Sequence, residues 1–397
     1  MTATTLKSET QTGPHANAPR AGRGRSPRGP KEIISFLTVV TVVFLSATWF
    51  VCATWNDFWG APARPQWWII PPALSVAFIV TTLVGMRHAN GLLQLLHRVS
   101  AVWIGVLNFS VFAAAACWIF RAASALCGWK IEPRWMAALF FGLAALAGAY
   151  GLVNAAWLRV TRVTVRLPNL PAAWHGREAV LAGDLHLGNV RGAGFARRVV
   201  KKIRRLRPFA VFVSGDMFDG PKADYDRLAE PWLELSAPGG IYFVTGNHEE
   251  FTERGKYLAA IGHAGLRPLN NEKVTVEGLQ IVGVHDGEAE DARQFGKILS
   301  GAALERGRAS ILLTHRPANL AMAEAAGVSL QLSGHTHEGQ CWPWSWVIYK
   351  VHGPFAYGLN RFGNLLVLTS SGAGTWGPPM RAGTKSEIVL LRLEREA

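Results

Sequence analysis

The sequence is poor in charge and in cysteine. Of its 397 residues, 17% are charged and 49% are hydrophobic, which is unusually apolar for a soluble protein. It has four cysteines, and three of them lie in or beside long apolar runs, so they do not form the framework of a disulfide-stabilised secreted domain. No internal repeat of solenoid period is present. The composition therefore indicates a protein that is partly embedded in a membrane.

Charged residues are nearly missing from four long stretches before residue 160. Each has roughly the 20 residues that a helix, rising 1.5 Å per residue, needs to cross about 30 Å of hydrocarbon. A cleaved signal peptide does not explain the first stretch, because its apolar core is too long and no clear cleavage site follows. Pro71 and Pro72 should kink the second helix or mark its first turn. The sequence predicts a transmembrane region over 33–158, with four helices at about 33–53, 67–86, 99–120 and 135–158.

The basic residues are concentrated in this membrane half. Residues 1–166 carry 15 Lys and Arg against 4 Asp and Glu, which is +11 of the chain's net charge of +14. The tail over 1–32 is basic and poor in large apolar residues, so we expect it to be disordered. Basic residues in the tail and after the second and fourth helices predict that both termini are cytoplasmic, although the loop after the third helix is also basic. The near-neutral second half argues against a nucleic-acid partner.

Residues 159–397 have a different pattern, in which short β-branched runs alternate with glycine-rich turns and helical stretches. This pattern is typical of an α/β domain, and its length is sufficient to bury a full core. The predicted strands are 178–183, 209–214, 241–245, 279–284, 310–314, 328–333, 365–370 and 387–393.

Polar side chains follow five of these strands, at the point where each strand ends. Because ligands of α/β sheets gather at the carboxyl ends of strands, we expect these side chains to converge. Their mixture of carboxylate, imidazole and amide groups suits divalent Mn, Fe or Zn, and one carboxylate can bridge two ions. The candidate residues at these strand ends are Asp184, His186, Asp216, Asp219, Asn247, His248, Glu249, His315, His335 and His337. Asp219, Glu249 and Asp286 are better candidates for hydrogen bonding around such a site or for capping than for a direct role.

The ordered motifs DLH, GDMFD, GNHE, TH and GHTH resemble those of the calcineurin-like metallophosphoesterase superfamily, in particular its membrane-associated bacterial YaeI/YkuE-like branch. The likeness extends over roughly 160–397 and includes LLTHRP and GTWGPPMRAGTKSEIVLLRL. It implies a four-layer αββα sandwich with two metal ions, in the bacterial cytoplasmic membrane. By this resemblance Asp184, His186 and His337 would hold one ion, Asn247, His315 and His335 the other, and Asp216 would bridge them. His248 would lie beside the scissile phosphate.

Such a site has a direct chemical use. Two ions about 3.5 to 4 Å apart can lower the pKa of a bridging water and hold phosphoryl oxygens, so the nucleophile would be a bridging hydroxide. His248 could stabilise charge or protonate the leaving group. Two positions depart from family patterns. Glu338 stands where the branch usually has Gly, and Gly220 stands where the protein Ser/Thr phosphatases have Arg, which makes that branch a poor match.

Two functions remain open on the sequence. The first is a membrane-anchored phosphoesterase acting on a phosphodiester, pyrophosphate or phosphomonoester, with membrane lipids as partners and a lipid-linked or membrane-proximal substrate. The second is a membrane sensor or transport-linked protein whose metal domain is regulatory. The four apolar runs have almost no ionisable residues, which favours anchoring over transport.

Two further stretches each allow two interpretations. Residues 195–207, FARRVVKKIRRLR, form either a helix packed on the sheet or a basic surface for anionic lipid headgroups. Residues 341–349, CWPWSWVIY, form either buried core or an aromatic contact at a membrane interface.

Overall fold

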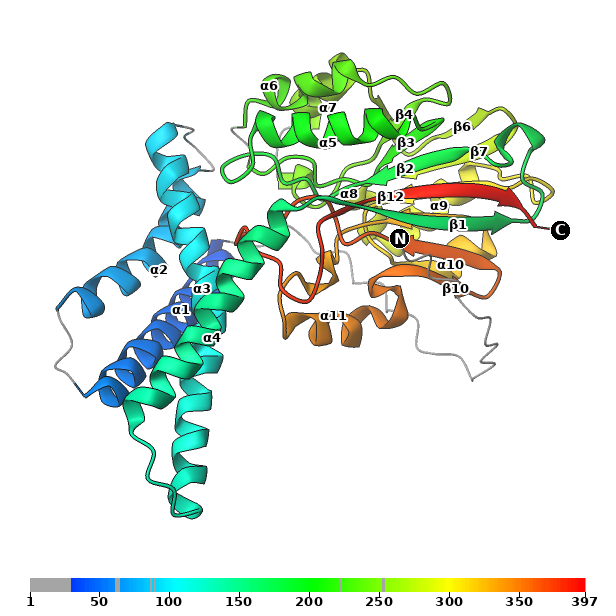
Figure 1. The fold of residues 1–397 in the computed structure, drawn as a ribbon. Helices are drawn as coiled ribbons and strands as arrows, with labels where there is room; N and C mark the ends of the chain where they lie inside the picture. Colours follow the sequence, from blue (N-terminus) through cyan, green and yellow to red (C-terminus); the bar gives the residue numbers. More distant parts are fainter. Residues whose placement is uncertain are drawn as a thin grey trace.

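The computed structural model describes residues 30–60, 65–85, 88, 90–220, 223–251 and 254–396. The predicted disordered tail therefore lies, as far as residue 29, outside the described residues. A bundle of long helices stands beside an α/β domain, and the chain passes from one to the other where α4 leads into β1 (Figure 1).

Within the described residues, four helices are long and apolar enough to cross a membrane. They are α1 (Pro30–Trp59), α2 (Pro65–Gly85), α3 (Gly91–Leu126) and α4 (Pro133–Ala156). Pro71 and Pro72 lie inside α2 and not in its first turn. The main differences from the predicted bounds are at the end of α1 and at both ends of α3. The α3 helix begins earlier because the Asn90 side chain caps it, accepting a hydrogen bond from the backbone N–H of Leu93 at 2.8 Å.

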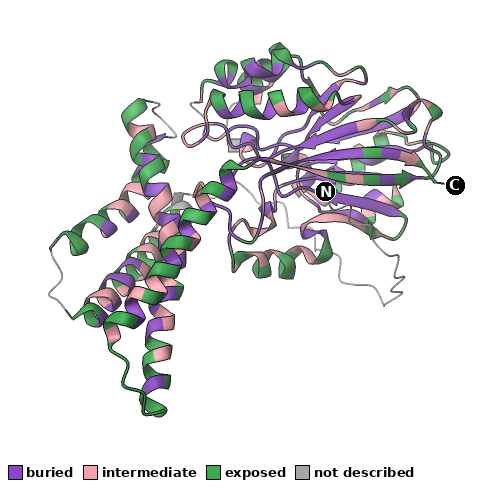
Figure 2. Cartoon of the chain, in the orientation of Figure 1, coloured by how far each residue is buried: buried purple, intermediate pink, exposed green. Residues whose placement is uncertain are grey.

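Polar side chains inside the bundle are paired between helices. The hydroxyl groups of Thr48 on α1 and Ser75 on α2 are 2.8 Å apart, and the indole N–H of Trp103 on α3 donates to Ser75 at 2.9 Å. Such pairing is expected where water is not available as a partner. Many residues of the bundle are exposed, as Figure 2 shows in green, and the exposed ones include many large apolar side chains, so the bundle presents an apolar surface to its surroundings.

The described part of the second half folds into two six-stranded sheets, ordered β1-β12-β2-β3-β4-β5 and β10-β11-β9-β8-β7-β6. Leu181 and Phe212 of the first sheet pack against Ile311 and Leu332 of the second. The strands are β1 (Arg159–Leu167), β2 (Glu178–Ala182), β3 (Ala210–Val213), β4 (Ile241–Phe243), β5 (Arg267–Pro268), β6 (Lys273–Val276), β7 (Leu279–Val284), β8 (Ser310–Thr314), β9 (Leu330–Ser333), β10 (Gly358–Phe362), β11 (Leu365–Thr369) and β12 (Glu387–Arg395).

Helices cover the outer faces of both sheets (Figure 1). Val199 and Ile203 of α5 pack in the outer core of the first sheet, and Phe295 of α9 and Leu320 of α10 pack in that of the second. The expected four-layer αββα fold after a helical membrane region is confirmed. The helices of this domain are α5 (Ala193–Leu206), α6 (Tyr225–Ala229), α7 (Arg254–His263), α8 (Asp286–Glu290), α9 (Ala292–Gly301), α10 (Leu320–Ala325) and α11 (Trp344–His352).

The two ambiguous stretches differ in burial. The apolar side of α5 is buried, so residues 195–207 form a helix packed on the sheet. By contrast, none of the nine residues of α11 is buried, so the interpretation of 341–349 as core is wrong for the helical part of that stretch. The side chains of Trp344 and Trp346 are 53% and 64% exposed.

Hydrogen bonds fix the bundle against the α/β domain. Asn108 of α3 accepts from the indole N–H of Trp344 at 2.9 Å, and Asn154 of α4 donates to the carbonyl oxygen of Arg381 at 2.8 Å. The backbone N–H of Arg381 donates to the carbonyl oxygen of Gly151 at 2.9 Å. These bonds join the bundle to α11, which follows the GHTH segment, and to the loop that precedes β12.

Candidate metal centre

The predicted ligands lie just beyond the carboxyl ends of five strands, three from the first sheet and two from the second. Asp184 and His186 follow β2, Asp216 follows β3, Asn247 follows β4, His315 follows β8, and His335 and His337 follow β9. Five of them have left-handed backbone conformations, with φ of 52° at Asp184, 50° at His186, 49° at Asp216, 72° at His335 and 48° at His337. A non-glycine residue in this region costs about 1 kcal/mol or more, and such strain is concentrated at functional sites.

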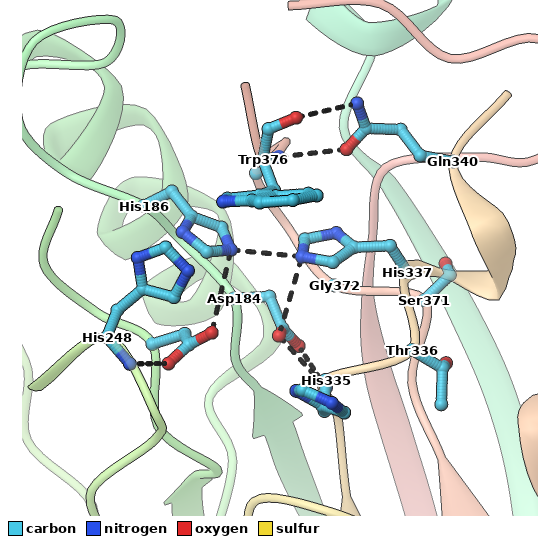
Figure 3. A network of polar contacts seen from close by, with 12 residues as sticks. Asp184, His186, His248, His335, Thr336, His337, Gln340, Ser371, Gly372 and Trp376 are labelled. Carbon is cyan, nitrogen blue, oxygen red and sulfur yellow. Dashed lines mark hydrogen bonds and ion pairs between the residues drawn. The ribbon is translucent and has the colours of Figure 1, made fainter. Parts of the chain in front are cut away.

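A first group of ligand atoms is formed by Asp184, His186 and His337, which lie within 4.8 Å of one another. The two imidazole Nε2 atoms are 3.0 Å apart, and His337 Nε2 is 3.7 Å from Asp184 Oδ1 (Figure 3). The Asp184 carboxylate also accepts a hydrogen bond from the backbone N–H of His335, at 2.9 Å. All three residues are buried.

A second group is formed by Asp216, His315 and His335, again within 4.8 Å. His315 Nε2 is 3.3 Å from Asp216 Oδ2, 3.1 Å from His335 Nδ1 and 3.1 Å from Asn247 Oδ1. Asp216 Oδ2 is also 3.8 Å from His186 Nε2 of the first group. Asp216 therefore lies between the two groups, at the position that a bridging ligand requires.

Two of the histidines have a tautomer that suits metal binding. His315 Nδ1 is 2.8 Å from the carbonyl oxygen of Ser214, which can only accept, so Nδ1 carries a proton. His186 Nδ1 is held in the same way by Asp219 Oδ1 at 2.8 Å. In both rings Nε2 is then the atom available to the site, as is usual for metal-binding histidines whose other nitrogen donates to a neighbouring group.

The charges of the cluster influence one another strongly. Burial raises the pKa of Asp184, whereas for Asp216 the neighbouring His315 and His248 outweigh burial and hold the pKa well below its usual range. Burial alone would lower the pKa of His315, but Asp216 outweighs it and raises that pKa to about 10. The Asp216 carboxylate therefore favours positive charge beside it.

His248 lies beside both groups. Its backbone N–H donates to Asp216 Oδ1 at 2.9 Å, its ring Nδ1 is 2.8 Å from Asp219 Oδ1, and its ring centroid is 4.7 Å from that of His186. Asp219 and Asp216 outweigh burial and raise the pKa of His248 to about 9. Ligand atoms of His248, His186 and Asp216 also lie within 4.8 Å of one another. His248 is thus close enough to act on a group held between the ligands.

Asp219 and Glu249 organise the site from outside the ligand groups. Asp219 accepts from both His186 and His248, and these two histidines hold its pKa far below the usual range in spite of burial. The Glu249 carboxylate accepts from the backbone N–H groups of Asp216, Phe218 and Gly246 at 2.7 to 2.9 Å, which ties the loops after β3 and β4 together. The hydrogen-bonding roles considered for both residues fit this arrangement.

Two other acidic residues near the cluster, Asp286 and Glu338, have partners outside it. Asp286 is paired with Arg316 at 2.8 Å, and burial raises its pKa to about 6. Glu338, the departure from the family pattern, hydrogen-bonds Tyr349 of α11, and burial raises its pKa to about 7.

Arg381 was not found by sequence reasoning. It is fully buried and donates to the carbonyl oxygens of His337 and Gly374 at 3.2 and 2.9 Å. An isolated arginine in a glycine-rich loop carries no signal of such a role.

This arrangement defines a domain of the metallophosphoesterase type, in which two histidine- and aspartate-rich groups share one carboxylate. A profile of the calcineurin-like phosphoesterase family matches residues 179–339. The chain belongs to the calcineurin-like phosphoesterase family, and the predicted resemblance is confirmed.

Several curated proteins are similar to the chain. A "Transmembrane protein with metallophosphoesterase domain" of Danio rerio is 32% identical over 271 residues, which are 64% of this chain and 61% of that protein. A metallophosphoesterase of Aquifex aeolicus is 30% identical over 64% of this chain and 98% of its own length. The Bacillus subtilis metallophosphoesterase YkuE is 26% identical over 65% and 94%. The chain spans about three-fifths of the Danio rerio relative.

Proposed function

We propose that the protein is a membrane-anchored, metal-dependent phosphoesterase that hydrolyses a phosphodiester, pyrophosphate or phosphomonoester at the membrane. The observation that carries this proposal is the pair of ligand groups joined at Asp216, with His248 beside them. Membership of the phosphoesterase family supports it.

The donor set fits two divalent ions such as Mn, Fe or Zn. Asp184, His186 and His337 would hold one ion, and Asn247, His315 and His335 the other, with Asp216 reaching both. Ions bound there would polarise a phosphoryl group and activate water for attack on it. The fixed Nδ1 protons of His186 and His315 make these rings ready to bind through Nε2.

His248 has the position of a general acid or a charge stabiliser. Asp219 accepts from its Nδ1, so Nε2 is the atom that can donate a proton to the leaving oxygen or to a phosphoryl oxygen. The backbone bond from His248 to Asp216 keeps the ring close to the ligand shared by both groups.

The protein is proposed to lie in the bacterial cytoplasmic membrane, and the arrangement of the helices supports a position of the α/β domain on the cytoplasmic side. The start of α1 and the end of α4 lie toward the α/β domain, and the connection between α3 and α4 lies at the far end of the bundle (Figure 1). Arg98 on α3, whose Nε donates to the carbonyl oxygen of Asn189, and Arg159 in β1 stand on the domain side. Basic residues on that side favour a cytoplasmic orientation. Arg87, which supported the same orientation, lies outside the described residues.

The test is hydrolysis of bis(p-nitrophenyl) phosphate and p-nitrophenyl phosphate by the purified full chain with Mn²⁺. Activity should require the metal and should fall by about 100-fold or more in Asp216→Asn and in His248→Ala. Matched controls are Asp226→Asn and His263→Ala, whose side chains are 80% exposed on α6 and α7.

The controls should keep the activity of the unaltered protein. Metal-independent hydrolysis, or equal rates in all four variants, would contradict the proposal. A folded, metal-loaded protein without activity on either ester would favour the sensor or transport-linked alternative.

A further inference from the structure

A cleft of about 770 Å³ connects the metal ligands with the helical bundle. At one end it is lined by the cluster, including His186, His248 and His337. At the other end it is lined by apolar side chains of three helices, among them Val43 and Ala47 of α1, Leu107 and Val111 of α3, and Trp344 and Ile348 of α11. Its two ends therefore have opposite chemistry, in a volume typical of a small-molecule site.

The apolar end is uncharged. Among the described residues that line the cleft, those outside the cluster include no Asp, Glu, Lys or Arg. Gln340 also lines it, but its side chain is already engaged, accepting from the backbone N–H of Trp376 at 2.8 Å and donating to the carbonyl oxygen of Pro378 at 3.0 Å. A strongly polar ligand group would lose its water there without gaining partners.

The position of the cleft along α3 places it at the surface of a bilayer. The 18 residues of α3 that follow Asn108, up to Leu126, span about 27 Å, close to the hydrocarbon thickness of about 30 Å. The Asn108 side chain accepts a hydrogen bond from the indole N–H of Trp344. Its Nδ2 donates to the carbonyl oxygen of Trp342 at 3.3 Å. The boundary between hydrocarbon and headgroups is thus expected near Asn108, at the level of α11.

The α11 helix has the character of an interfacial helix. Its Trp346 and Val351 are 64% and 58% exposed, and it extends away from the side of the bundle, across the direction of the bundle's helices (Figure 1). Tryptophan is enriched where one part of a side chain is in hydrocarbon and the other is in water. The cleft between α11, α1 and α3 therefore opens where a lipid would present its headgroup and the first part of its chain.

We propose that this cleft binds the hydrocarbon chain of an amphiphilic phosphate ester from the bilayer, with the phosphate at the metal ligands and the chain between α1, α3 and α11. The inference rests on the proposed phosphoesterase function and specifies its substrate class. A water-soluble phosphate ester without a chain would use only the polar end of the cleft.

The experiment compares two soluble diesters, p-nitrophenyl ethyl phosphate and p-nitrophenyl octyl phosphate, below the concentration at which the octyl ester aggregates. Each methylene group that leaves water for an apolar pocket is worth about fourfold in affinity, so partial burial of six more should raise kcat/KM by about tenfold or more. The purified full chain with Mn²⁺ should therefore prefer the octyl ester.

Two pairs of adjacent substitutions test whether this cleft causes the preference. Val43→Trp on α1 and Ile348→Trp on α11 place a bulky ring in the lining, whereas Val42→Trp and Val347→Trp alter neighbouring exposed residues outside it. Val43→Trp and Ile348→Trp should abolish the octyl preference and keep the rate with the ethyl ester. Val42→Trp and Val347→Trp should keep both the preference and the rate.

The outcomes separate the two proposals. Equal kcat/KM for the two esters in the unaltered protein, or an undiminished octyl preference in both lining variants, would overturn the chain-binding inference and leave the phosphoesterase function intact. Failure of the unaltered protein to hydrolyse either ester would contradict the proposed function, and the inference would fall with it.

Discussion

Asp219 is expected to influence metal binding and proton transfer together, although it belongs to neither ligand group. Its Oδ1 accepts from Nδ1 of His186 and from Nδ1 of His248, both at 2.8 Å. We predict the effect of Asp219→Asn, which keeps the size of the side chain and removes its charge. A hydrogen bond to a charged group contributes about 1.5–3 kcal/mol against about 0.5–1.5 for a neutral one, so each bond should weaken by about 1 kcal/mol.

Each bond acts on a different quantity, so a loss of about 1 kcal/mol per bond corresponds to roughly fivefold in rate and roughly fivefold in metal affinity. Well below saturating metal the two losses multiply to about 30-fold, which lies within the roughly 10- to 100-fold effect of removing hydrogen-bond partners of metal-binding histidines. The assay is kcat/KM for bis(p-nitrophenyl) phosphate over a series of Mn²⁺ concentrations. Asp219→Asn should lower kcat/KM at saturating metal, through His248, and should raise the Mn²⁺ concentration for half-maximal activity, through His186.

The matched control is Asp226→Asn, because Asp226 is an exposed aspartate with a distant histidine neighbour, His263 Nδ1 at 3.8 Å. It should leave both quantities unchanged. The reasoning is refuted if Asp219→Asn keeps both within twofold of the unaltered protein. A change in only one of them would show that only one of the two hydrogen bonds matters to the chemistry.

Three further effects are expected. Removing metal with a chelator should lower the apparent Tm. Adding Mn²⁺ at 100 times its Kd should restore about 2.7 kcal/mol of the free energy of unfolding, and the Asp216→Asn variant should largely lack this effect. Arg381→Met should destabilise the fold by about 3 kcal/mol, because buried carbonyl groups lose their donor, whereas the same change at exposed Arg361 should leave Tm unaltered. Gly334→Ala should lower activity by about 100-fold, since a Cβ there would lie 2.2 Å from the Asp184 carboxylate, and Gly255→Ala, with open space around it, should not.

The sequence predicted the strands that are buried on both faces and missed those that are not. The eight predicted segments correspond to β2, β3, β4, β7, β8, β9, β11 and β12, most of which are continuous apolar runs. The missed strands, β1, β5, β6 and β10, stand at or next to sheet edges or consist of only two to five residues. In β1, arginines alternate with valines and threonines, so the segment resembled the basic flank of a transmembrane helix.

The ligand groups could be proposed from sequence because each ligand stands next to the end of a buried strand, and the topology then brings those ends together. Asp219 could be suggested for the same reason, since it follows β3 closely. The cleft could not be suggested. It is formed by α1, α3 and α11, and its position along α3 is fixed by the bond between Asn108 and Trp344, which are 236 positions apart. No local pattern records a contact of that range.

The bundle supports the candidate site directly. The side chain of Arg381 donates to the carbonyl oxygen of the candidate ligand His337, while its backbone N–H donates to Gly151 of α4 and its backbone carbonyl oxygen accepts from Asn154 of the same helix. One buried residue therefore connects a candidate metal ligand directly to a helix of the bundle. Since buried backbone groups need partners, separating α4 from this loop would leave the N–H and carbonyl groups of Arg381 unpaired and release the segment that holds His337. The helices and the candidate metal ligands are for this reason one structural unit, and the position of the cleft between them follows from it.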